Sequence, residues 1–152
     1  MLSFIFPSHN ETIVTPLKAE EIAKRFARAT NNRLPANREH LFSGWVKENQ
    51  FVISLKVTRP NNYLPRVSGQ IESTSSGSIL FLRSQLFPTT KMFMMFWFLF
   101  IFLGGLVVGF QSKNWLYLLG GFALIGFIYW IVWSNFTIQY RHTRKAIEQA
   151  LN

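Results

Sequence analysis

Two long apolar stretches dominate the second half of the chain, and no charged side chain interrupts either of them. They cover Met92–Phe110 and Trp115–Trp133 and are separated by the polar turn Gln111–Asn114. At 1.5 Å per residue, a helix over either stretch is about 28 Å long, close to the hydrocarbon thickness of a bilayer. The pattern therefore predicts a membrane α+β protein with a two-helix transmembrane hairpin over residues 91–133.

The more polar first half predicts a small α+β domain over residues 1–90. Apolar residues recur at helical spacing after Thr15-Pro16, which is a typical helix start, and this pattern ends near Thr30. Alternation with a period of two then predicts four strands, which are Leu41–Lys47, Phe51–Thr58, Arg66–Ser73 and Ser78–Leu86. The short links between them indicate a four-stranded antiparallel meander with one face covered by the early helix.

The strand predicted over Phe51–Thr58 shows the clearest alternation of apolar and polar residues. Successive side chains of a strand point to opposite faces, so every second residue shares a face. The side chains expected to face the core are Phe51, Ile53, Leu55 and Val57. Lys56 is expected on the opposite face of the sheet.

Basic residues flank the predicted hairpin on the side of the soluble domain. Those beside the span ends are Arg83, Lys91, Arg141, Arg144 and Lys145, whereas the connecting turn holds only Lys113. Because short cytoplasmic segments carry an excess of Lys and Arg, this asymmetry orients the hairpin. The sequence predicts a multi-pass protein of the plasma (inner) membrane with both termini in the cytoplasm and the turn outside.

The second apolar helix is expected to run on as a basic juxtamembrane helix over residues 134–152. Arg141, Arg144 and Lys145 are spaced so that they share one face of it. This face is a candidate site for anionic lipid, because each cation near a membrane surface contributes about 1 kcal/mol. The alternative is that these residues only set the orientation of the hairpin.

Small residues predict close packing of the two apolar helices. The candidate packing residues are Gly105, Gly109, Gly121 and Gly126. In lipid, small residues let helix backbones approach each other closely. The short turn favours packing within the hairpin, and an interface between copies in a homo-oligomer is the alternative.

Composition limits the chemistry that the chain can carry. The 152 residues include no cysteine, and all seven acidic residues are glutamate. Catalysis by a cysteine thiolate and metal sites with cysteine ligands are excluded. No glycine-rich phosphate loop or nucleophile elbow occurs. The three histidines fall in separate segments. We therefore expect no catalytic residue, no metal ligand and no cofactor, and hence no enzyme.

The loop Arg59–Arg66 is the most distinctive feature of the polar half. Two prolines stiffen it, and it concentrates hydrogen-bonding groups around one aromatic ring. Tyr and Arg are frequent among the residues that dominate interface energies. The candidate partner-binding residues are Arg59, Asn61, Asn62, Tyr63 and Arg66. A rigid strand connection is the alternative interpretation.

Three motifs resemble a group of small, uncharacterised bacterial membrane proteins. The motifs are Phe42–Val46, Phe51–Ile53 and Tyr63–Ile71, and the apolar hairpin follows them. The resemblance covers about Leu41 to Trp133 and implies a β-meander that precedes a transmembrane hairpin. It implies no activity and no functional residue.

These expectations favour a non-catalytic accessory or scaffold protein, or a small subunit of a membrane complex, that binds a protein partner through its cytoplasmic domain. The second hypothesis is a membrane-surface sensor that binds anionic lipid or another polyanion. The net charge of +9 suits a polyanion. However, the orientation of the hairpin already accounts for the basic residues beside the spans, so a nucleic-acid partner is not favoured.

Overall fold

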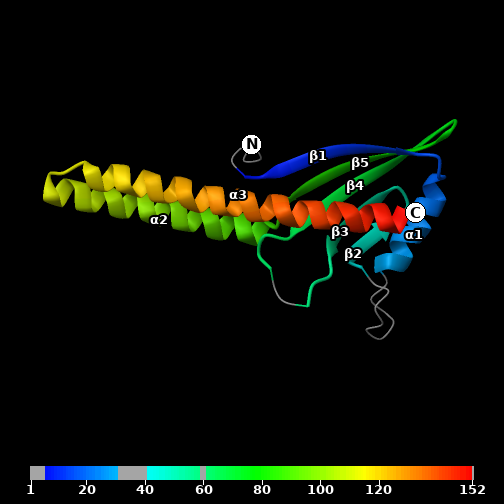
Figure 1. Cartoon of the computed structure of the whole chain (residues 1–152), viewed down its shortest axis with the longest axis horizontal. Coiled ribbons are helices and arrows are strands. Elements are labelled where there is room, and N and C mark those ends of the chain that lie inside the picture. Colours follow the sequence, from blue (N-terminus) through cyan, green and yellow to red (C-terminus); the bar gives the residue numbers. More distant parts are fainter. Residues whose placement is uncertain (1–5, 31–40, 59–60, 152) are drawn as a thin grey trace.

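The computed structural model describes residues 6–30, 41–58 and 61–151, which form an antiparallel sheet joined to a long helical hairpin (Figure 1). The elements are β1 (Ser8–Thr15), α1 (Ala19–Thr30), β2 (Phe42–Lys47), β3 (Gln50–Leu55), β4 (Pro65–Thr74), β5 (Gly77–Leu86), α2 (Pro88–Ser112) and α3 (Leu116–Leu151). The sheet occupies one end of the molecule. From it, α2 and the first half of α3 extend side by side (Figure 1).

The sheet has five strands in the order β1-β5-β4-β3-β2, and every neighbouring pair is antiparallel. The antiparallel meander of β2 to β5 is confirmed, but the prediction of four strands was wrong because β1 adds a fifth at the edge. In β1 the alternation of inward and outward residues does not separate apolar from polar side chains. His9 and Glu11 lie on the face of the sheet that the helices cover. There they meet Tyr140 and Arg144 of α3, so polar partners replace the expected apolar ones.

The predicted early helix is confirmed as α1, although it begins at Ala19 rather than directly after Pro16. Thr15 ends β1, and its side-chain oxygen accepts a hydrogen bond from the backbone N–H of Leu17 at 3.3 Å. The buried residues of α1 are Ala19, Ile22, Phe26 and Thr30, whose spacing places them on one side of the helix.

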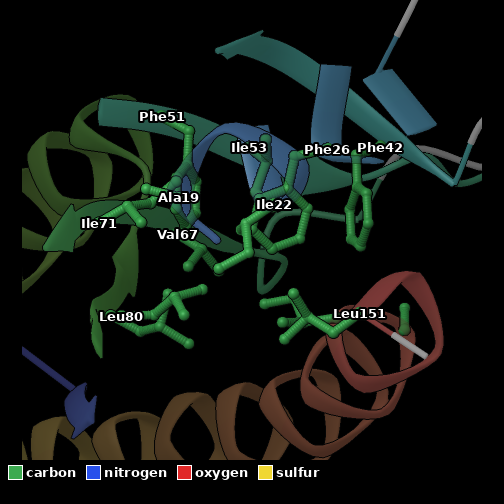
Figure 2. Close-up of a cluster of buried hydrophobic side chains, with 13 residues drawn as sticks. Ala19, Ile22, Phe26, Phe42, Phe51, Ile53, Val67, Ile71, Leu80 and Leu151 are labelled. Atoms are coloured by element: carbon green, nitrogen blue, oxygen red, sulfur yellow. The ribbon is translucent and has the colours of Figure 1, made fainter. Parts of the chain in front are cut away.

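Two helices, α1 and the last part of α3, cover the same inner face of the sheet. The ring of Phe26 from α1 lies 4.7 Å from that of Phe51 on β3, measured between centroids. From α3, Ala146, Ile147 and Leu151 enter the same core cluster. Figure 2 shows side chains of α1, of the strands and of Leu151 gathered in this cluster. The core of the sheet therefore depends on the end of the helix that begins in the hairpin.

Strand β3 buries only part of the face predicted for it. Phe51 and Ile53 are each 1% exposed, and Leu55 is partly buried. Val57 lies beyond the end of β3 and is 41% exposed, so its predicted place in the core was wrong. The apolar alternation runs past the point at which pairing with β2 and β4 stops.

The two helices α2 and α3 are long and apolar enough to cross a membrane. Only 11% and 6% of their most apolar segments are buried inside the structure, so the two helices differ from the core helices of a soluble protein. Between them, Lys113 adopts a left-handed conformation with φ of 50° and ends α2. The side-chain oxygen of Asn114 then accepts a hydrogen bond from the backbone N–H of Leu116 at 3.0 Å and caps α3.

The burial of β3 predicts unequal effects for two substitutions of similar chemistry. Ile53→Ala should lower the free energy of unfolding by about 2–5 kcal/mol, because a fully buried side chain leaves a cavity. Val57→Ala should cost under about 0.5 kcal/mol, as is usual at an exposed position. Thermal unfolding of the full chain in detergent measures both. Equal losses would show that Val57 belongs to the core after all.

Candidate functional site

A second apolar cluster joins the sheet to the hairpin. Its buried members come from the N-terminal segment, β5, α2 and α3, and are Phe6, Leu86, Met94, Val132 and Phe136. Tyr63, Phe98 and Ile128 pack against them. We call this cluster the joint, because it holds the end of β5 against the base of both long helices.

The described part of the predicted recognition loop is tied to the joint. The backbone N–H of Tyr63 donates to the side-chain oxygen of Asn61 at 2.9 Å. The hydroxyl of Thr90 on α2 donates to the backbone oxygen of Asn62 at 3.1 Å. Tyr63 is partly buried against the joint, and Arg59 lies outside the described residues. Thus Tyr63 stabilises the chain itself, which limits the surface that this loop offers to a partner.

A cavity of about 600 Å³ lies where the loop meets the hairpin. Its polar part is formed by Asn62, Tyr63, Thr89 and Thr90. Apolar side chains of α2 and α3 form the rest, and they are Phe93, Met94, Trp97, Phe98, Ile128 and Val132. A cavity with one polar end and apolar walls suits an amphiphilic molecule.

The outer face of the sheet, opposite α1 and α3, carries exposed aromatic side chains. The register aligns Trp45, Val52, Ser68 and Arg83 in one row across β2 to β5. Phe81 lies opposite Gln70 in the next row. Trp45 and Phe81 are 45% and 42% exposed, and they flank a shallow groove of about 300 Å³. We call this groove the outer groove. The outer groove is not predictable from the sequence, because it depends on strand register, which no single segment encodes.

The basic residues of α3 have different surroundings. Arg144 forms ion pairs with Glu11 on β1 at 2.8 Å and with Glu148 at 3.3 Å. Arg141 and Lys145 are exposed on the same helix. The charge of Arg144 is therefore largely neutralised within the chain, and its contact with Glu11 holds β1 against α3.

Tyr140 completes this contact between β1 and α3. Its hydroxyl donates to a carboxylate oxygen of Glu11 at 2.7 Å, and its ring stacks on that of His9 with 4.5 Å between centroids. Burial, and next the hydrogen bond to Glu11, raise the pKa of Tyr140 to about 12. The phenol thus stays neutral at physiological pH and acts as a donor that fixes the strand.

Two of the four candidate packing glycines lie at the contact between α2 and α3, and a third, Gly109, lies against the turn that joins them. A Cβ atom at Gly105 would lie 3.4 Å from the backbone oxygen of Tyr117, and one at Gly121 would lie 3.6 Å from that of Ile101. Gly109 faces the backbone oxygen of Asn114 in the same way. A Cβ atom at Gly126 would meet nothing within 4 Å. Thus Gly126 takes no part in packing within the hairpin.

The described residues hold no group of three or more His, Cys, Asp or Glu side chains that could bind a metal ion. Where His9, Glu11 and Tyr140 do come together, each is engaged in stacking, ion pairing or hydrogen bonding with the others or with Arg144. Comparison of the chain with family models, with curated proteins and with solved structures finds no match in any of the three. The resemblance to small bacterial membrane proteins therefore stays a prediction.

The contact between Tyr140 and Glu11 predicts a pH-dependent stability. The pKa of Tyr140 is about 12 in the folded chain, against about 10 for an unfolded tyrosine. Its stabilising effect is therefore complete below about pH 10 and is lost as the pH rises toward 12. Tyr140→Phe should cost roughly 1.5–3 kcal/mol at neutral pH, as expected for a hydrogen bond to a charged group.

Urea unfolding at neutral pH and at high pH compares the two chains. The difference in stability between wild type and Tyr140→Phe should shrink at high pH, because phenylalanine does not ionise. A difference that is constant with pH would show that the phenol does not donate to Glu11 in solution.

Proposed function

We propose that the chain is an integral membrane protein whose helices α2 and α3 span the plasma (inner) membrane, with the sheet and both termini in the cytoplasm. The apolar side chains of these helices are largely exposed, and each Å² of apolar surface left in water costs roughly 25 cal/mol. Lipid removes that cost. The excess of basic residues beside the sheet over the single Lys113 in the turn supports the orientation.

Aromatic side chains support the same placement. Trp115 lies beside the turn, while Trp130 and Trp133 lie nearer the sheet, and all three are exposed. Tryptophan is enriched at both membrane–water interfaces, where its ring is in an apolar layer and its N–H is hydrated. Trp115, just before α3, and the pair Trp130 and Trp133 on α3 would each lie near one of these two interfaces.

We infer that the protein is a non-catalytic scaffold or accessory subunit that binds a protein partner through the outer face of its sheet. The observation that carries this inference is the one-sided covering of the sheet. Both α1 and α3 pack on the inner face, whereas the outer face keeps Trp45 and Phe81 exposed. Exposed aromatic residues that flank a groove are typical of protein interfaces.

The chemistry of the outer groove supports a protein segment as the partner. Trp45 and Phe81 offer apolar surface at its sides, and Gln50, Ser68 and Gln70 offer hydrogen-bonding groups along it. A protein segment that inserts an apolar side chain between the two aromatic rings fits this arrangement. A second copy of the chain is the alternative occupant, which the experiment below distinguishes.

The experiment places a photo-crosslinking amino acid at Phe81 in cells. It should capture one protein partner, whereas the same amino acid at Lys24, on the exposed side of α1, should not. Trp45→Ala should abolish the adduct, because truncating an aromatic anchor commonly costs about 2 kcal/mol or more of binding energy. Ile138→Ala, which removes a 50% exposed apolar side chain from α3, is the matched control and should leave the adduct intact.

Two results would contradict the proposed contact. Identical adducts from Phe81 and Lys24 would indicate collisions without a binding site. An adduct made only of two copies of this chain would show that the outer groove is a homo-oligomer interface and not a site for another protein.

A further inference from the structure

Three cations gather where the outer face of the sheet meets α2. Arg66 on β4 lies opposite Gln85 on β5, and Gln85 accepts a hydrogen bond from the ammonium group of Lys91 at 2.8 Å. Arg83 lies two residues before Gln85 and therefore on the same face. Side chains at such diagonal positions are about 7–8 Å apart, within reach of long cationic side chains. We call Arg66, Arg83 and Lys91 the cation cluster.

Within the described residues, no acidic side chain pairs with the cation cluster. None of its three members forms an ion pair with any residue in the described part of the chain. Lys91 is partly buried, and this burial and next the positive charges of Arg83 and Arg66 disfavour its protonated form. Like charges held together store electrostatic free energy, which a bound anion releases.

The charge of the basic C-terminal helix is compensated differently. Arg144 is paired with Glu11 and Glu148, so only Arg141 and Lys145 remain for an anion on that predicted face. The cation cluster keeps three cationic residues beside Gln85, none of them in an ion pair with a described residue. The geometry therefore favours the cluster over the helix as an anion site.

The position of the cluster indicates where the anion comes from. Lys91 directly precedes Met92, the first residue of the apolar stretch, and β5 ends at Leu86 in the joint. If α2 enters the membrane at Met92, Lys91 lies at the level of the lipid phosphates, as cations at the ends of membrane helices do. Arg66 and Arg83 then face the same layer from the sheet.

We propose that Arg66, Arg83 and Lys91 bind the phosphate group of an anionic membrane lipid in the leaflet next to the sheet. The proposal rests on the membrane placement of α2 and α3 described above. A guanidinium group can donate two parallel hydrogen bonds to phosphate oxygens. The ammonium group of Lys91 adds another charge-assisted hydrogen bond. Such a lipid would fix the sheet at the membrane surface with its outer groove accessible from the cytoplasm.

Native mass spectrometry of the full chain in detergent tests the lipid site. Phosphatidylglycerol and phosphatidylcholine with identical acyl chains are the two probes, and wild type should prefer phosphatidylglycerol. The cluster variant combines Arg66→Gln, Arg83→Gln and Lys91→Gln and should lose this preference by about tenfold or more. The control variant removes three exposed cations elsewhere through Lys18→Gln, Lys24→Gln and Lys56→Gln, and it should keep the preference.

Several outcomes would overturn the proposal. If the cluster variant and the control variant lose the preference for phosphatidylglycerol equally, the preference depends only on net charge. If wild type shows no such preference, the site does not exist. Glycerol phosphate, the headgroup chemistry without acyl chains, is a third probe. If it, or a soluble acidic peptide, binds the cluster as tightly as phosphatidylglycerol, the ligand is not a membrane lipid.

Protease resistance separates loss of binding from loss of folding. If the triple variant is cleaved faster than wild type, Arg83→Gln alone replaces it, because this side chain is exposed and its loss leaves the core untouched. The lipid preference in detergent does not depend on orientation or on the outer groove. Its failure is therefore distinguishable from failure of the proposed partner binding, which Trp45→Ala reports separately.

Discussion

The structure depends on α3, because this one helix buries two different surfaces at its two ends. Its first half packs against α2 through close backbone contacts at Gly105 and Gly121. Its last turns complete the core of the sheet, where Ile147 and Leu151 join the cluster formed by α1 and the strands, and where α3 contacts β3 and β4. A continuous helix of 36 residues is about 54 Å long and stiff on that scale. The apolar hairpin and the sheet are therefore fixed relative to each other.

This arrangement explains why the sheet is covered on one side only. Because α3 leaves the hairpin on the inner side, it joins α1 there, and the outer face is left without a helix in the described chain. The cation cluster lies on this same outer face: Arg83 is in the row of Trp45, Val52 and Ser68, although it does not line the outer groove. Lipid and protein partner would bind next to each other, so each could affect the other's affinity.

The sequence predicts those elements whose own pattern of apolar residues determines their structure. It does not predict β1 or the exposure of Val57, because these depend on contacts with distant segments. The two long apolar helices of the hairpin are recognisable from their own length and composition. Strand β1 was missed because its inward residues His9 and Glu11 are satisfied by α3, more than a hundred residues away. Val57 continues an apolar alternation after strand pairing has ended. The sequence indicates Tyr63 as a candidate partner-binding residue, but its packing against the joint was not predictable. The groove beside Trp45 was not predictable either.

We propose above all that α2 and α3 cross the membrane and leave the sheet in the cytoplasm. The chain has no cysteine, so a single introduced thiol reports one position without background. Ser112 ends α2, and Ser76 lies in the exposed turn between β4 and β5. In intact cells, a membrane-impermeant thiol reagent should modify Ser112→Cys, whereas Ser76→Cys should react only after the cells are opened. Modification of Ser76→Cys in intact cells, with Ser112→Cys protected, would contradict the claim.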